Sequence, residues 1–593
     1  MKLLKKHVSC ALLTLPLLQS SLGGISASAA TIPATVTPAS EPSWGYFVGS
    51  YKNNSSVNMT ENSNPTIGLL SEYNNLWKPG TTWDTGTKLN SSVLDANIQK
   101  VLDITANRTA SEADAAYIDD RRNQSYSVMD GLGSLTDVYR MNAGATTTIN
   151  NVPADATTKK YDDQGNNAGS TSSSLGNIVS LVNTLRGNYS STSPAKNYFS
   201  YPRPFRWSST SIIVPALVPA INPDPSKDGG FPSGHTNAAY LSAIAMAYAV
   251  PERYQELLTR ASELGNNRIV AGMHSPLDVM GGRVMATALA AAILSDPANQ
   301  NLKKAAYDDA HSKLLTQTGT ATDRFSDYSK NKTDYTQRLT YGFKQLNSTT
   351  NPMVVPKGAE VLLETRLPYL DSTQRRWVLA TTGLPSGYPV LDDPEGWGRL
   401  NLFAAADGYG AFATDVTVTM DSSKGGFNSL DHWRNDISGT GKLTKKGTGT
   451  LILQGNNTYA GGTQIDQGTL EGDSETAFGK GDVTNNGGTV SENVSGRVII
   501  DGNYTQSDNG TLELSLSDKN DQLEVNGGVI TKGKLLLNFE NQYVPDKNVT
   551  IISFNKHHRQ GEFSSIETKG LPSQYKVKVN YNSDSIQLKV IKK

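Results

Sequence analysis

Cysteine is almost absent from this sequence, with Cys10 as the single example among 593 residues. Cys10 lies in an N-terminal segment that has early lysines, an apolar run from Ala11 to Leu18 and small residues at 27–29. This pattern is typical of a secretory signal peptide, so we expect residues 1–29 to be cleaved off. The mature chain then contains no cysteine, which excludes a fold held by disulfides even in an oxidising compartment.

Strong net charge and long apolar runs are also missing. Lysine and arginine total 54 against 55 aspartates and glutamates, a formal charge of -1, which excludes the basic balance of a nucleic-acid-binding protein. After the leader, the most apolar stretch is 284–294, which is too short to span a bilayer and follows Arg283. We interpret it as a buried, alanine-rich core helix, and we predict no nucleic-acid partner and no transmembrane span.

The length and the changing pattern along the chain predict a multidomain protein. Apolar residues recur at helical spacing through 66–145, 175–185 and 236–315, and a loop rich in Gly, Ser, Asn and Asp occupies 162–174. Beyond about 414, short alternating strands are broken by Gly, Asn and Asp. We therefore predict a signal peptide at 1–29, a helical domain at 30–350 with its motif core at 175–300, an irregular segment at 351–413 packed on the helical body, and a β-rich, solenoid-like domain at 414–593.

Three short motifs in the helical region carry groups suited to phosphate chemistry. In chain order they are Lys196-x6-Arg203-Pro204, Pro232-Ser233-Gly234-His235 and Arg268-x5-His274-x3-Asp278. A phosphate monoester brings a charge of about -1.5 to -2 at neutral pH, and its transfer requires fixed cations. Arg203 and Arg268 can each bind two phosphate oxygens through a planar guanidinium, and Lys196 adds a compact charge. We predict that these three side chains bind the phosphate.

The second motif precedes a strongly helical run that begins near Thr236. Free backbone N–H groups at a helix N-terminus bind anions, and Gly234 allows the phosphate to approach closely. Ser233 can donate its hydroxyl to the same phosphate. We predict that Ser233 and Gly234 bind phosphate and that His235 protonates the leaving alcohol as a general acid.

The third motif ends at a predicted helix start, with Ser275 as N-cap, Pro276 as the first helical residue and Asp278 two residues later. His274 stands just outside this helix, within reach of Asp278. A carboxylate that accepts the N–H of one imidazole nitrogen leaves the other nitrogen bare to attack phosphorus. We predict that His274 is the nucleophile and that Asp278 orients it.

Each motif also has a plainer interpretation when it is taken alone. Asp278 can be only a capping-box acid, Pro-Ser-Gly only a turn, and an arginine or lysine only a solvated surface charge. All three motifs in this order favour a catalytic site over that set of coincidences.

Together, the three motifs resemble the signature of the type 2 phosphatidic acid phosphatase (PAP2) superfamily, which includes bacterial class A non-specific acid phosphatases and vanadium haloperoxidases. Only Asn267 departs from the pattern, because the family usually has a phosphate-assisting serine there. Residues 251–253, Pro-Glu-Arg, further resemble the class A enzymes. The resemblance implies an all-α helical bundle, a covalent phosphohistidine on His274, protonation by His235, and no metal or other cofactor, with phosphate or vanadate able to occupy the site.

The stretch 441–463 resembles the strand repeat in passengers of bacterial autotransporters, with its glycines and the alternating run 448–453. This resemblance implies a β-solenoid for the C-terminal tail. We expect the tail to contact the cell envelope or partner proteins.

These observations predict an exported, metal-independent acid phosphatase of broad specificity that acts on small phosphate esters. We expect it in the periplasm, on the outer surface or in the medium of a Gram-negative-type bacterium. Two alternatives stay open: a vanadium-dependent haloperoxidase that uses the same pocket, and a surface adhesin that acts through its β-tail.

Overall fold

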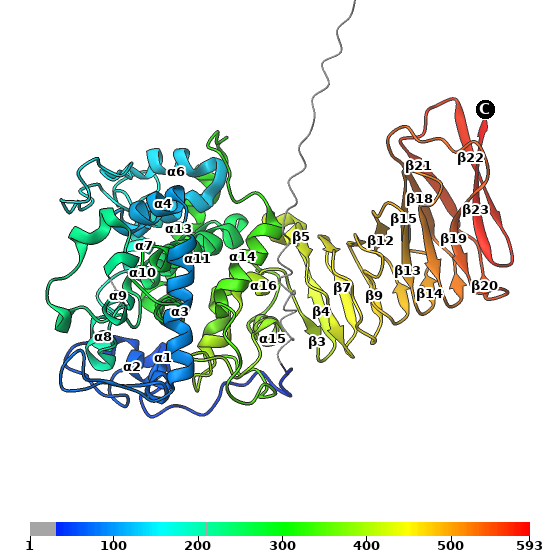
Figure 1. Cartoon of the computed structure of the whole chain (residues 1–593). Helices are drawn as coiled ribbons and strands as arrows, with labels where there is room; N and C mark the ends of the chain where they lie inside the picture. Colours follow the sequence, from blue (N-terminus) through cyan, green and yellow to red (C-terminus); the bar gives the residue numbers. More distant parts are fainter. Residues whose placement is uncertain (1–30, 209) are drawn as a thin grey trace, which may run out of the picture.

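The computed structural model describes residues 31–208 and 210–593, so the predicted signal peptide at 1–29 lies outside the described residues. A rounded helical body is followed by an elongated stack of strands that extends from one side of it (Figure 1). This arrangement confirms the predicted fold class, a helical region followed by a β-solenoid. A two-stranded hairpin, β1 (Trp77–Lys78) with β2 (Thr87–Lys88), is the small exception within the helical body.

Three long helices form the centre of the helical body: α10 (Gly234–Ala249), α11 (Tyr254–Val270) and α12 (Pro276–Ser295). Both α11 and α12 pack on α10, as do α7 (Gly176–Leu185) and α13 (Gln300–Asp309). The other helices of the body are α1 (Phe47–Ser50), α2 (Pro65–Leu69), α3 (Ser91–Asn107), α4 (Ala110–Arg121), α5 (Gln124–Val128), α6 (Thr136–Ala143), α8 (Ser193–Phe199), α9 (Pro204–Trp207) and α14 (Tyr328–Thr340).

Helix α12 contains the apolar stretch that the sequence drew attention to. By length and composition it could cross a membrane, yet every residue from Pro276 to Leu294 is buried inside the body. Small side chains on α10 and α12 allow the two helices to pack closely, because alanine places little volume between backbones. The structure therefore makes α12 a core helix, as the sequence predicted.

The starts of α10 and α12 are fixed by local capping. The Ser233 side chain accepts from the Thr236 N–H at the start of α10. Ser275 and Asp278 form a reciprocal capping box at the start of α12, after which Pro276 supplies the first helical residue. The Ser233 N–H also donates to the Asp278 carbonyl at 2.8 Å, so the second and third motifs are joined directly.

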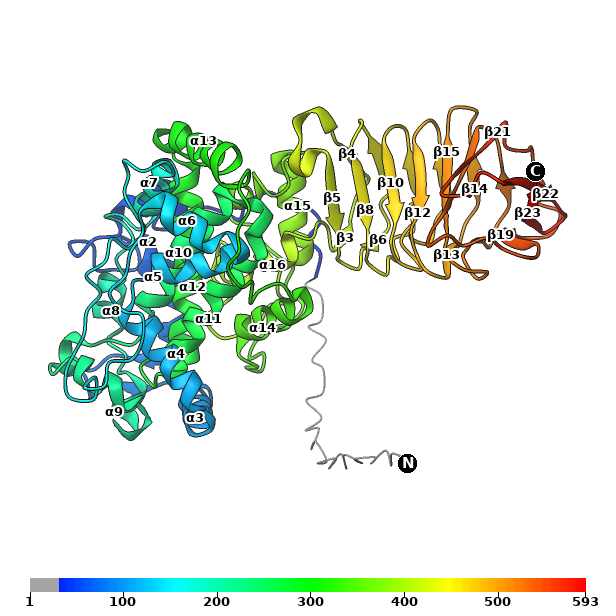
Figure 2. The ribbon, with the colours of Figure 1, turned by 90° about the horizontal axis from the view of Figure 1, so that it is seen from above.

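Short helices of residues 359–405 lie between the body and the strands (Figure 2). The 3-10 helices at Ala359–Leu363 and Trp397–Arg399 pack on α12, and α16 (Leu402–Ala405) packs on α11 and on α15 (Ser372–Thr382). The first turn of the solenoid is joined to this segment through the buried Asp431 carboxylate. This carboxylate accepts hydrogen bonds from Arg366 at 2.7 Å and from the Tyr369 hydroxyl at 2.5 Å. Apolar packing continues across this junction, so the two parts share one core.

The tail is a parallel β-solenoid of about six turns, in which each strand lies in register on the equivalent strand of the turn before. Leu451, Leu470, Val490, Leu512 and Leu535 form one such column, and all five are buried. One sheet contains β5 (Leu430–Trp433), β8 (Thr450–Leu453), β10 (Thr469–Gly472), β12 (Thr489–Glu492), β15 (Thr511–Leu516), β18 (Lys534–Phe539) and β21 (Ser565–Lys569).

A second sheet of seven strands forms another face of the coil. It contains β4 (Val416–Thr419), β7 (Leu443–Lys446), β9 (Thr463–Ile465), β11 (Val483–Asn485), β14 (Tyr504–Gln506), β17 (Val529–Ile530) and β20 (Arg559–Gln560), and the short pair β3 (Ala411–Phe412) with β6 (Ser438–Gly439) lies beside the first turns. Along the strands, buried side chains alternate with partly exposed ones, as in β15, which explains the period-two pattern in the sequence.

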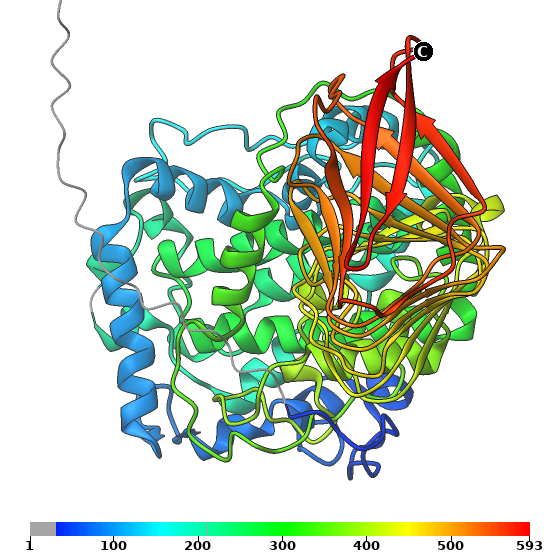
Figure 3. The same ribbon diagram turned by 90° about the vertical axis from the view of Figure 1, so that its right-hand side faces the viewer.

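The last sheet differs because it mixes parallel and antiparallel pairs. Its order is β13 (Arg497–Ile500), β16 (Gln522–Val525), β19 (Val549–Phe554), β23 (Ser585–Lys592) and β22 (Tyr575–Tyr581). Strand β23 pairs antiparallel with both β19 and β22, and the β22–β23 hairpin projects at the end of the stack, where the end-on view shows it in front of the coils (Figure 3).

A cluster of buried and part-buried carboxyl groups joins the N-terminal part of the body to the segment before the solenoid. The Asp392 N–H donates to the Glu72 carboxyl at 3.0 Å, and Glu395 accepts from the Phe47 N–H at 3.1 Å. Burial raises the pKa of Glu72 to about 8, and the neighbouring Asp392 and Asp393 add to this effect. Glu72 therefore holds a proton in the folded protein at pH values where it is ionised in the unfolded chain.

This difference predicts how a Glu72→Gln variant responds to pH. Between a pH near the ordinary glutamate pKa and pH 8, the folded state binds the extra proton, so stability falls as pH rises. Glutamine keeps an uncharged side chain at every pH and removes this loss. We expect Glu72→Gln to raise Tm above wild type by several degrees at pH 8 and by little at pH 5, measured by calorimetry. Glu61→Gln, outside the cluster, is the control, and a Tm difference that does not change with pH would contradict the prediction.

Candidate active site

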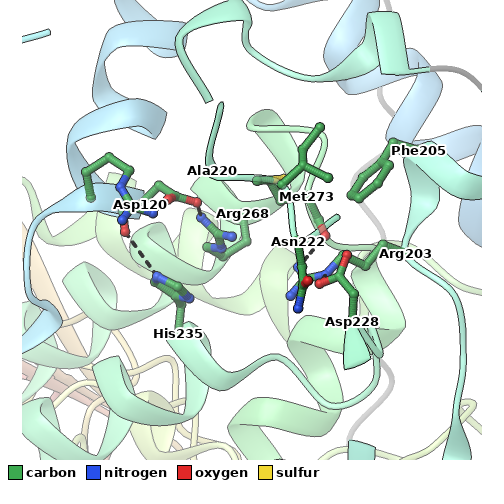
Figure 4. Close-up of a pocket in the computed structure, with 11 residues that line it drawn as sticks. Asp120, Arg203, Phe205, Ala220, Asn222, Asp228, His235, Arg268 and Met273 are labelled. Atoms are coloured by element: carbon green, nitrogen blue, oxygen red, sulfur yellow. Dashed lines mark hydrogen bonds and ion pairs between the residues drawn. The ribbon is translucent and has the colours of Figure 1, made fainter. Parts of the chain in front are cut away.

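The three motifs meet at a cavity of about 100 Å³ within the helical body (Figure 4). Groups from α4, from the start of α10, from the end of α11 and from the loops around 203–228 surround it. Its lining residues are Asp120, Arg121, Arg203, Phe205, Ala220, Ile221, Asn222, Asp228, His235, Arg268 and Met273.

Of the predicted site residues, Arg203, His235 and Arg268 line this cavity directly. The others do not line it, although hydrogen bonds connect His274 to Arg203 and to Asp278, and Ser233 to Asp278. The ring of His274 contacts both Arg203 and Asp278. Sequence motifs separated by up to 82 positions in the chain are thus brought to one place.

His274 is held between a carboxylate and a guanidinium. Its Nδ1 lies 3.2 Å from Asp278 Oδ2, and its Nε2 lies 2.9 Å from an Arg203 nitrogen. A guanidinium can only donate, so Nε2 accepts and the ring proton lies on Nδ1, facing the carboxylate. Burial, with the charges of Arg203 and Lys196, holds the pKa of His274 well below its usual range. The ring is therefore neutral, and its Nε2 lone pair faces Arg203.

Asp278 serves two purposes at once. The same Oδ2 atom that faces His274 accepts from the Ser275 N–H at 2.8 Å. Burial raises the pKa of Asp278 to about 6, which the Ser275 bond and the charges of Lys196 and Arg203 oppose. The capping contact and the contact to the imidazole therefore coexist in one side chain, because the helix start itself directs the carboxylate at the imidazole.

His235 stands at the start of α10 and donates to the main chain of α4. Its Nε2 lies 3.0 Å from the Asp120 carbonyl oxygen, and a carbonyl only accepts, so the proton of the neutral ring lies on Nε2. Burial and the nearby Arg203, Arg121 and Lys196 lower the pKa of His235 to about 3. A bound phosphate dianion would oppose these cations and favour the charged imidazolium that a general acid requires.

The predicted phosphate-binding cations are each held by a protein acceptor. The Arg203 Nε donates to Asp228 at 2.6 Å, and Asp228 also pairs with Arg206. Lys196 donates to the Gly229 carbonyl at 2.5 Å, and burial together with the charge of Arg203 lowers its pKa to about 7. These contacts fix the cations before a substrate arrives, which lowers the cost of ordering them.

Ser233 and Gly234 lie at the start of α10. Ser233 is fully buried, and its oxygen accepts from the Thr236 N–H and hydroxyl as the cap of α10. A Cβ added at Gly234 would lie 3.1 Å from the Thr192 hydroxyl. Neither residue lines the cavity, so their predicted contacts to phosphate stay a prediction.

Sequence reasoning missed Asp120, Arg121 and Asp228. Asp120 forms a buried ion pair with Arg268, which lies 148 positions later in the chain. The only local signal was the Asp-Asp-Arg run at 119–121, which marks the end of a helix but does not reveal which cation lies opposite it. Asp228 precedes the second motif by a few residues and carried no signal of its own.

Asn267, the one departure from the expected signature, does not line the cavity. Its amide donates to Asp119 at 2.7 Å, and Asp119 also forms a buried pair with Arg260 at 2.6 Å. This residue therefore belongs to a structural network beside the site. Within 31–208 and 210–593, no three His, Cys, Asp or Glu side chains gather as potential metal ligands.

Comparisons with known proteins find matches for both the helical body and the β-solenoid. Residues 177–302 match the PAP2 superfamily, and residues 443–471 match the passenger-associated-transport-repeat. A non-specific acid phosphatase of Salmonella typhi is 37% identical over 121 residues, covering 20% of this chain and 47% of that protein.

Two other relatives have names that describe exported proteins. An extracellular serine protease of Serratia marcescens is 33% identical over 196 residues, 28% of this chain and 18% of that protein. The Neisserial autotransporter lipoprotein NalP of Neisseria meningitidis serogroup B is 36% identical over 131 residues, 21% of this chain and 12% of that protein. The chain spans less than half the length of each relative. These findings confirm the predicted resemblances to the PAP2 superfamily, to acid phosphatases and to autotransporter repeats.

Proposed function

We propose that this protein is an exported phosphatase that hydrolyses phosphate monoesters through a covalent phosphohistidine on His274, without a metal ion and with broad specificity. The observation that carries the proposal is the buried Asp278–His274–Arg203 chain of contacts beside a cavity that also exposes His235 and Arg268. The match to the PAP2 superfamily and the acid phosphatase relatives support the same chemistry.

The first step transfers the phosphoryl group to the enzyme. The His274 Nε2 lone pair forms a bond to phosphorus while the ester P–O bond breaks and its electron pair leaves with the alcohol oxygen. His235, as imidazolium, gives that oxygen a proton. Arg203, Arg268 and Lys196 balance the charge on the phosphoryl oxygens.

The second step releases phosphate. His235, now neutral, takes a proton from a water molecule as that water attacks phosphorus. The P–N bond breaks, and its electron pair returns to His274 Nε2. Asp278 keeps the other ring nitrogen protonated throughout, which stabilises the positive charge that the phosphorylated imidazole carries.

Hydrolysis of p-nitrophenyl phosphate by the mature chain, with EDTA present and no added metal, tests this proposal. We expect turnover that EDTA does not change, and a ³²P-labelled protein intermediate that survives alkali but not acid, as a phosphoramidate does. Loss of activity in EDTA would contradict the metal-independent mechanism. Bromide oxidation after vanadate loading, in place of hydrolysis, would support the haloperoxidase alternative.

We also propose that the solenoid attaches the phosphatase to the cell envelope or to a partner protein. Two observations support this role: the passenger-associated-transport-repeat at 443–471 and the autotransporter-like relatives from Gram-negative bacteria. The solenoid projects away from the cavity-bearing body, so attachment through its far end would leave the body free (Figure 1). The adhesin alternative keeps this surface but assigns no role to the intact catalytic set.

A further inference from the structure

The last turn of α4 supplies the candidate active site with two groups from a single residue, Asp120. Its carboxylate accepts from Arg268, and the other carboxylate oxygen lies 3.0 Å from Arg121. Its carbonyl oxygen accepts from His235 Nε2 at 3.0 Å. Figure 4 shows Asp120 next to both Arg268 and His235, at one side of the cavity. One residue thus contacts a predicted phosphate-binding cation and the predicted general acid.

The carboxylate fixes the direction of the Arg268 guanidinium. A guanidinium is planar with five donors, so an anion on one edge leaves the remaining donors facing a defined direction. The Asp120 contact uses one terminal nitrogen, and Arg268 Nε is buried without a hydrogen-bond partner. A buried donor without a partner is costly, and a phosphate oxygen in the cavity would satisfy it. Both side chains are almost fully buried, so water competes little with the pair.

The carbonyl fixes the ring of His235 in a similar way. Because the Asp120 oxygen accepts from Nε2, Nδ1 is the atom left to carry the proton that is given to the leaving group and later taken from water. The peptide of Asp120 is rigid, since it lies in the last turn of α4, a helix that packs on α11. The two contacts therefore set the relative placement of Arg268 and His235 across the cavity.

We propose that Asp120 is a positioning residue of the phosphatase site, whose carboxylate aims Arg268 at the phosphoryl group and whose carbonyl holds His235 in its working tautomer. This inference rests on the proposed function. It assigns to α4 a role that the three sequence motifs do not contain, and it predicts that the loss of one carboxylate charge weakens phosphate binding without removing the acid or the nucleophile.

An Asp120→Asn variant separates the two contacts. Asparagine keeps the main-chain carbonyl that accepts from His235, but it loses the side-chain charge that pairs with Arg268. We expect the Kd of inorganic phosphate, measured by titration calorimetry, and the KM of p-nitrophenyl phosphate to rise about tenfold, the loss of about 1.4 kcal/mol of binding. We expect kcat to change by only a few fold, since His235 and His274 are retained. An unchanged phosphate Kd would overturn the proposal.

Asp119→Asn is the matched control. Asp119 is the preceding residue, is equally buried and pairs with Arg260 and Asn267 away from the cavity. We expect this variant to lower Tm and to leave the phosphate Kd as in wild type. If both variants weakened phosphate binding equally, Asp120 would be only a structural residue and the proposal would be wrong.

A double-variant comparison keeps the test decisive if Asp120→Asn folds poorly because Arg268 is left without its partner. The Arg268→Gln variant and the Asp120→Asn/Arg268→Gln double variant both lack the Arg268 charge, and the double variant restores a neutral pair. We expect these two proteins to have the same phosphate Kd, because Asp120 acts on phosphate through Arg268. A further loss in the double variant would overturn the assignment. Calorimetry needs no turnover, so a wild-type protein that binds phosphate but hydrolyses no ester would overturn the proposed function and leave the positioning test intact.

Discussion

Replacing His274 with alanine is expected to lower kcat for phosphate-ester hydrolysis by about 10⁴-fold or more, the loss typical of removing a catalytic nucleophile. The physical reason is that Asp278 holds the His274 ring in the tautomer that leaves the Nε2 lone pair bare, and alanine removes that lone pair. Steady-state hydrolysis of p-nitrophenyl phosphate measures the effect.

The matched control for this prediction is His311→Ala. The His311 imidazole stacks on Tyr307 and pairs with Glu252 at 2.9 Å, outside the cavity. The His311→Ala variant should keep wild-type kcat, so a general effect of losing a histidine can be separated from loss of the nucleophile. If His274→Ala retained wild-type turnover, or formed the same labelled intermediate, the nucleophile would be a different group.

The second large effect is expected for His235→Ala, and it should depend on the leaving group. A positioned general acid contributes about 10²–10⁴-fold when the leaving oxygen needs a proton. An alkyl phosphate releases a basic alkoxide and should lose most of that factor. p-Nitrophenyl phosphate releases an acidic phenol, so its transfer to His274 should be much less affected.

The measurement is kcat/KM for an alkyl and an aryl phosphate with wild type and His235→Ala. For each protein, the ratio of kcat/KM for the alkyl ester to kcat/KM for the aryl ester isolates the protonation step, because the contribution of binding the common phosphoryl group cancels in this ratio. Equal losses for both esters would show that His235 acts in binding alone. Asp120→Asn, which retains His235 and its carbonyl partner, provides a second comparison, because its losses should be the same for both esters.

The architecture shows how local sequence patterns succeed where they act over short distances. Ser275 and Asp278 are three positions apart, and this spacing alone predicted the capping box that starts α12. Alternation in the run 511–516 predicted β15, since successive strand side chains face opposite sides. The apolar stretch at 284–294 was interpreted as a core helix because it is too short for a bilayer, and α12 is buried along that stretch.

The candidate site contains contacts that local sequence patterns do not predict. Arg268, His274 and Asp278 belong to one motif, so their proximity follows from a helix end and a helix start. Asp120 reaches the same cavity from α4, and nothing in its neighbours indicates that contact. The hydrogen bond from Asn267 to Asp119 depends equally on how α4 packs against α11.

By itself, the sequence determined the chemical inventory of this protein: the helical body, the strand repeat, and the cations, imidazoles and carboxylate of a phosphate site in a set order. These follow from residue types and short spacings, which local propensity and side-chain chemistry fix. Only the tertiary structure decided which acceptor holds each cation, which ring nitrogen of His235 and His274 carries the proton, and that Asp120 lies between Arg268 and His235. Those features arise from packing between distant segments, where the energy of one contact depends on the whole core around it.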